Sequence, residues 1–127
     1  MKRVFVAVIA LLLVAGVAYA NHFNVVKKAG DVTVKVVIDG DPIKVGDNKL
    51  AIELLDSNGK SITDADVTVY YFMPSMPAMN YETQATSDGV KYAAVINPVM
   101  PGEWDADIKV KRNGGDVQKA TISFGVK

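Results

Sequence analysis

Alternation of apolar and polar residues with a period of two runs through most of the chain and constrains its fold more than any other feature. Six segments show it clearly, and they span residues 32–39, 50–54, 67–71, 92–96, 104–111 and 122–126. Shorter segments near 23–28 and 81–86 follow the same rule. Strict alternation is typical of strands that have one buried face and one face in water. The pattern predicts an all-β protein, with Trp104 buried on the inward face of its strand.

Short clusters of Gly, Asp, Asn and Pro separate these segments and predict turns. They lie at 29–31, 39–42, 56–59, 87–89 and 113–116, and no stretch shows a sustained helical period. Strands separated by turn signals roughly every 8–12 residues are typical of immunoglobulin-like domains. We therefore expect one immunoglobulin-like antiparallel β-sandwich of seven to eight strands.

The first 20 residues have the layout of a secretory signal peptide. Lys2 and Arg3 precede an apolar run at 4–17, and Ala18-Tyr19-Ala20 provides small residues on both sides of Tyr19. The apolar run is about 14 residues long, whereas a membrane-spanning helix needs about 20. We expect cleavage after Ala20, a mature domain at 21–127 that is periplasmic or secreted, and no membrane insertion after cleavage.

Composition excludes several classes of function. The chain has no cysteine, so disulfides, thiolate chemistry and cysteine-based zinc sites are excluded. Loss of Lys2 and Arg3 leaves 12 basic residues (14 − 2) against 14 acidic ones, a net charge of about −2, and no basic field for nucleic acid. A single histidine excludes most Ser–His arrangements as well. We expect a protein that is not an enzyme.

One segment, with the sequence MPSMPAM at residues 73–79, breaks the alternation. Its two prolines cannot donate to a sheet, which predicts a loop or an edge segment with polyproline II character. In that conformation Met73, Met76 and Met79 project from one side as a stripe, but successive methionines lie roughly 9 Å apart along the chain, too far for one ion to bind two of them. The stripe fits three roles: packing at the end of the sandwich, capture of Cu(I) by thioethers, or contact with a partner protein.

Strand parity predicts which other residues lie near this segment. If strands alternate in direction, the connection at 97–103 with Met100 returns to the same end, as do residues 39–48 and the mature N-terminus. The candidate metal ligands are therefore Met73, Met76, Met79, Met100 and His22. His22 follows the expected first mature residue, so the α-amine, the amide and the imidazole could chelate Cu(II); the alternative is a solvated histidine.

The spacing of several residues resembles the YtkA-like domain family. The positions that carry this resemblance are Gly46 and Asn48; Asp56, Gly59, Ala65 and Val67; Met73, Pro74 and Met76; and Met100, Gly102 and Trp104. The resemblance implies a small extracytoplasmic β-sandwich, often found beside components of copper or heavy-metal export and cytochrome oxidase assembly. It implies no established activity. The family loop often continues Met-x-Met, where this chain has Met79-Asn80-Tyr81.

Two functional hypotheses follow. The first is an exported domain that binds or delivers copper or another heavy metal through its methionines, with Cu(I) as the candidate ligand. The alternative is an interaction module that docks its methionine and proline segment on a membrane metal-export or oxidase-assembly complex.

Overall fold

The computed structural model describes residues 22–40 and 42–127. The expected signal peptide and its cleavage site lie outside these residues. Nine strands form within the described part of the chain: β1 (His22–Ala29), β2 (Val32–Asp39), β3 (Asn48–Leu55), β4 (Asp66–Met73), β5 (Met76–Gln84), β6 (Thr86–Ser87), β7 (Tyr92–Ile96), β8 (Gly102–Lys111) and β9 (Val117–Val126). No described residue belongs to a helix, so none forms an apolar helix able to cross a membrane.

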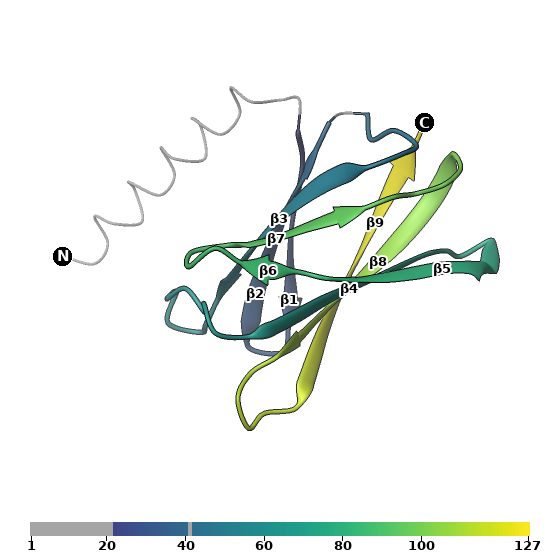
Figure 1. Cartoon of the computed structure of the whole chain (residues 1–127). Helices are drawn as coiled ribbons and strands as arrows, with labels where there is room; N and C mark the ends of the chain where they lie inside the picture. Colours follow the sequence, from purple (N-terminus) through teal and green to yellow (C-terminus); the bar gives the residue numbers. More distant parts are fainter. Residues whose placement is uncertain (1–21, 41) are drawn as a thin grey trace.

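The strands form two sheets that pack face to face (Figure 1). One sheet has the order β1-β2-β3-β7-β6 and the other has the order β5-β4-β8-β9. Every pair of neighbouring strands is antiparallel. The predicted antiparallel β-sandwich is confirmed. The described part of the chain has nine strands where seven to eight were predicted, and the additional one is the two-residue strand β6.

The core lies between the sheets and follows the alternation in the sequence. On β2 the residues Val32, Val34, Val36 and Ile38 are buried, while the residues between them face outward. On β8 the inward residues begin with Trp104, whose exposed fraction is 0%. The predicted burial of Trp104 is therefore confirmed.

Antiparallel pairing brings several connections to one end of the sandwich, which we call the methionine end. The start of β1 lies there, together with the β2–β3, β4–β5 and β7–β8 connections (Figure 1). Backbone hydrogen bonds tie this end together, since Gly46 N donates to Pro98 O (3.1 Å) and Val45 N donates to Lys127 O (3.1 Å). The prediction that the connections within 39–48, 73–80 and 97–103 share one end is confirmed, although residues 76–80 and 102–103 belong to strands β5 and β8.

The methionine segment does not form the expected polyproline II stripe. β4 continues to Met73, the chain turns at Pro74-Ser75, and Met76 begins β5, which is an edge strand as predicted. Main-chain pairing of Met73 with Met76 is followed by pairing of Phe72 with Asn80, so residues 77–79 bulge out of the sheet. The prolines occupy the turn and the edge bulge, where no ladder N–H is needed. The methionines consequently face different ways.

Candidate functional site

Three aromatic rings form a cluster beneath the methionine end. Tyr71 of β4, Tyr81 of β5 and Trp104 of β8 face inward because strand alternation places them on the same side of their sheet. The centroid of Tyr71 lies 5.5 Å from that of Tyr81 and 6.0 Å from that of Trp104, and Tyr81 stacks on Trp104 at 6.3 Å. These spacings are typical of favourable aromatic pairs.

The aromatic cluster fixes the connection that carries Met100. The backbone N–H of Asn97 donates to Tyr71 Oη (3.0 Å), and Trp104 Nε1 donates to the carbonyl oxygen of Met100 (3.0 Å). Two hydrogen bonds thus hold the β7–β8 connection against the same rings that β5 covers. The β4–β5 turn and the β7–β8 connection meet over one aromatic cluster.

The four methionines at this end differ in exposure. Met73 is 4% exposed, and its terminal methyl group lies against Gly102. Met79 and Met100 are partly buried against the core, and the sulfur of Met79 accepts a hydrogen bond from Tyr81 Oη (3.2 Å). Met76 is 41% exposed. The structure therefore packs three methionines at the end of the core and leaves Met76 at the surface.

His22 lies at the methionine end but not with the methionines. Its strand, β1, is an edge of the first sheet and contacts β9, whereas β7 of that sheet contacts β4 and β5. The width of the sandwich therefore separates His22 from the β4–β5 turn. His22 Nδ1 lies 3.2 Å from Asp39 Oδ1, so chelation through that nitrogen would require the ring to leave Asp39. No group of three or more His, Asp or Glu side chains suited to a metal ion occurs within residues 22–40 and 42–127.

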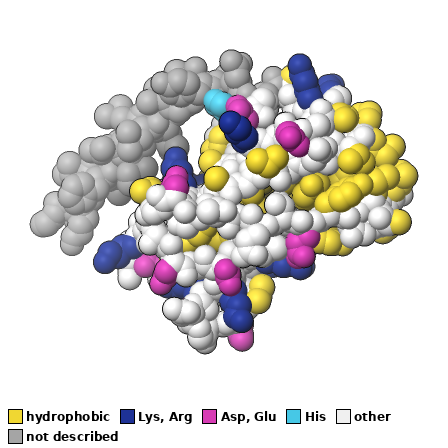
Figure 2. All heavy atoms as spheres, viewed as in Figure 1, with side chains coloured by type: hydrophobic (Ala, Val, Ile, Leu, Met, Phe, Trp, Pro, Cys, Tyr) yellow, Lys and Arg dark blue, Asp and Glu magenta, His cyan; other side chains and the backbone are white. Residues whose placement is uncertain are grey.

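The sequence did not predict that Val99 and Pro101 are exposed beside the methionine and proline segment. We define the apolar tips as residues 74–78 of the β4–β5 turn together with Val99 and Pro101 of the β7–β8 connection. All seven residues are exposed, and only Ser75 has a polar side chain. Figure 2 shows a continuous apolar surface at the right of the molecule, where these two connections lie in Figure 1. The available signal was the absence of charged residues from 73–79 and 97–102.

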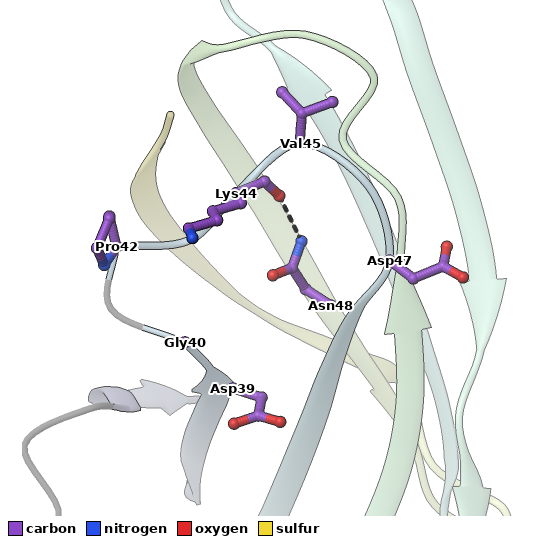
Figure 3. A pocket seen from close by; sticks show the side chains of 7 residues that line it. All are labelled: Asp39, Gly40, Pro42, Lys44, Val45, Asp47 and Asn48. Atoms are coloured by element: carbon purple, nitrogen blue, oxygen red, sulfur yellow. Dashed lines mark hydrogen bonds between the residues drawn. The ribbon is translucent and has the colours of Figure 1, made fainter.

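A polar hollow of about 530 Å³ lies beside the β2–β3 connection, and its lining side chains do not converge (Figure 3). Asp47 points away from Asp39, and its Oδ1 accepts a hydrogen bond from Asn97 Nδ2 (2.9 Å). Asn48 Nδ2 donates to the carbonyl oxygens of Lys44 (2.7 Å) and Gly46 (2.9 Å). A ligand site needs a few polar groups aimed at one point. The hollow is therefore a weaker candidate than the methionine end.

Several positions that carry the family resemblance have structural roles. Asn48 is 8% exposed and closes the β2–β3 connection through the two bonds above. Asp56 Oδ1 accepts hydrogen bonds from the backbone N–H of Lys60 (2.9 Å) and of Asn58 (2.8 Å), and these bonds lower the pKa of Asp56. Gly59 completes that turn with φ of +82°, a conformation that favours glycine.

Tyr92 holds the opposite end of the sandwich in place. Its Oη donates to the carbonyl oxygen of Ile62 (2.8 Å) and accepts from the backbone N–H of Ala65 (3.0 Å). Burial raises the pKa of Tyr92 above its usual value, because the charged phenolate is disfavoured away from water. The shifted pKa thus has a structural cause.

Comparisons with known proteins agree with this architecture. A family model described as YtkA-like matches residues 26–109. Among solved structures, the soluble domain of PmoD from Methylocystis sp. ATCC 49242 (Rockwell) superimposes with a TM-score of 0.59 at 13% sequence identity. The match covers 80% of this chain and 96% of that chain, and at this identity it supports the fold alone. No curated protein matches the sequence.

Proposed function

Because the chain belongs to the YtkA-like family, we propose that it is an exported, non-enzymatic domain that binds Cu(I) at its methionine end and delivers it to a partner. The observation that carries this proposal is the meeting of the β4–β5 turn and the β7–β8 connection over one aromatic cluster. The four methionines of residues 22–127 lie in the β7–β8 connection and in the ends of β4 and β5 that flank the turn. Thioethers are soft ligands that select Cu(I) over harder ions.

The ligands in this proposal are Met76, Met79 and Met100. Met76 is already exposed, and the partly buried side chains of Met79 and Met100 can turn outward because methionine has three rotatable bonds. Binding would release the Met79 sulfur from Tyr81 Oη or use its second lone pair. Met73 stays in a structural role because it is 4% exposed.

Export and the absence of catalysis belong to the same proposal. The leader at residues 1–20 supports export to the periplasm or beyond. A single histidine and no cysteine leave few ways to build a nucleophile with its base.

Competition for Cu(I) tests the proposal. We expect the exported protein to take Cu(I) from a chelator of micromolar affinity. Replacing Met76, Met79 or Met100 by leucine removes the sulfur and nearly keeps the side-chain volume. Each variant should lower the affinity on the order of tenfold or more, since even indirect changes around a metal cost that much. Met73→Leu is the matched control and should bind normally. Wild-type protein that takes no Cu(I) would end the metal proposal.

The apolar tips favour a second candidate function, docking on a membrane transport or oxidase-assembly complex. Exposed apolar patches of this kind mark sites of interaction. Photo-crosslinking from position 78 in the native cell should then capture one membrane protein, and Val99→Asp should abolish the crosslink without changing Cu(I) affinity. Capture of no membrane protein would argue against this function.

A further inference from the structure

The apolar tips form one exposed surface that can be buried in a single apolar environment. Met76 is 41% exposed and Val99 is 45% exposed, and they lie on two different connections at the same end. No charged residue interrupts either segment from 73 to 79 or from 97 to 102. The two tips consequently form one apolar surface, seen in Figure 2, that only the folded chain assembles.

The backbone of the tips also tolerates an apolar environment. Three of the seven tip residues are Pro74, Pro77 and Pro101, which have no N–H group. Met76 pairs with Met73 in the hairpin, and Asn80 Nδ2 donates to the carbonyl oxygen of Pro77 (2.9 Å). Unpaired backbone donors and acceptors are what makes burial in hydrocarbon unfavourable. These tips therefore have fewer backbone N–H donors than turns without proline have.

We propose that the apolar tips rest in the interfacial layer of a lipid bilayer and orient the methionine end toward the membrane. Figure 1 shows that the two connections project from the end of the sandwich. Projecting apolar tips can bury their side chains in a deformable lipid surface, which needs no complementary pre-shaped partner. The proposal does not depend on Cu(I) binding, because it rests on exposed carbon surface and not on sulfur.

The course of the chain supports the same orientation. β1 begins at the methionine end, so the apolar residues 4–17 join the domain at the end that carries the tips. If residues 1–20 are the expected signal peptide, this end emerges beside the membrane until cleavage. Contact of the tips with lipid would keep that orientation after cleavage.

The charged residues around the apolar tips indicate which lipids the tips can bind. The exposed charged residues of this end have both signs, and they include Lys44, Asp47, Glu103 and Lys127. They form no basic patch that would select anionic lipids. Binding should therefore occur on zwitterionic vesicles and change little with salt, because apolar contact is not screened. This membrane contact could not be predicted from composition, because the two apolar segments meet only in the folded structure.

Environment-sensitive fluorophores on single cysteines test the proposal. The chain has no native cysteine, so Ala78→Cys provides one thiol at a tip, and Val117→Cys provides one at the opposite end. We expect zwitterionic phosphatidylcholine vesicles to shift the emission of the probe at 78 to shorter wavelength. The probe at 117 should not respond. Equal responses at 50 mM and 500 mM salt would exclude an electrostatic origin.

Vesicle flotation with aspartate variants provides the second measurement. Val99→Asp should reduce the vesicle-bound fraction of the exported protein about tenfold, because a charge is costly in the interface. Val117→Asp is the matched control, since Val117 is 55% exposed at the opposite end, and should float like wild type. A silent probe at 78 would overturn the proposal. A probe that responds only when a membrane protein is reconstituted would also overturn it and would identify a protein partner instead.

Discussion

The terminal methyl carbon of Met73 lies against Gly102, so that a Cβ at position 102 would be 2.8 Å from it. This contact joins the end of β4 to the start of β8. Gly102 also has φ of +134°, which residues with a side chain rarely adopt. Met73 and Gly102 are both positions of the family resemblance, and their contact gives that pairing a physical reason.

Gly102→Ala should destabilise the protein more than Gly46→Ala does. Both glycines have positive φ, and an added methyl group at Gly46 meets no atom within 4 Å. Backbone strain should cost about 1–3 kcal/mol at either position. Gly102→Ala should cost about 0.5–1.5 kcal/mol more, because the buried terminal methyl group of Met73 must move away from the new Cβ. Urea unfolding measures the difference, and equal losses would show that Met73 moves freely.

Truncation should separate Met73 from Met76. Met73→Ala should lower the free energy of unfolding by about 2–5 kcal/mol, since it removes a buried side chain and leaves a cavity. Met76→Ala should change it by no more than about 0.5 kcal/mol, as is usual at exposed positions. Thermal and urea unfolding of both variants check this. Similar losses for the two would contradict the assigned difference in burial.

Asn48 should be sensitive to the loss of its amide group. Asn48→Ala leaves the carbonyl oxygens of Lys44 and Gly46 without their donor and should cost about 1–3 kcal/mol. Asn48→Asp should cost more at neutral pH, because its carboxylate would face the same two oxygens. Protonation should recover part of that loss. An Asp variant as stable as wild type at pH 7 would contradict this role.

Two turn aspartates should make stability depend on acid. Asp56 accepts hydrogen bonds from the backbone N–H groups of Lys60 and Asn58, and Asp88 accepts them from Lys91 and Val90. These bonds lower the pKa of both carboxyl groups below 3.8, the usual value for aspartate. A carboxylate whose pKa is lower in the folded state stabilises that state above the unfolded pKa. This contribution is lost as the pH falls below about 4 and through the folded pKa. Asp56→Asn with Asp88→Asn should flatten the profile of unfolding free energy between pH 4 and 2. An unchanged slope would show that other carboxylates dominate.

The strands, the core and the connections that share one end were all predictable from the sequence. Alternation such as that of β2 decides which side chains face inward, because successive residues of a strand point to opposite sides. Strand parity then placed Met100 near the β4–β5 turn, as the structure confirms at the level of the connections. These inferences need only local geometry and the order of strands.

The role of each methionine could not be predicted from the sequence, because it depends on the tertiary structure. Residues 73–79 could have formed polyproline II, but pairing of Met73 with Met76 and the contact with Gly102 bury one sulfur and expose another. The separation of His22 from the methionines also depends on the order of the strands within each sheet. The alternating direction of successive strands does not define that order. The apolar tips arise from two segments more than 20 residues apart in the sequence. Burial depends on which distant surfaces meet, and no local pattern contains that information.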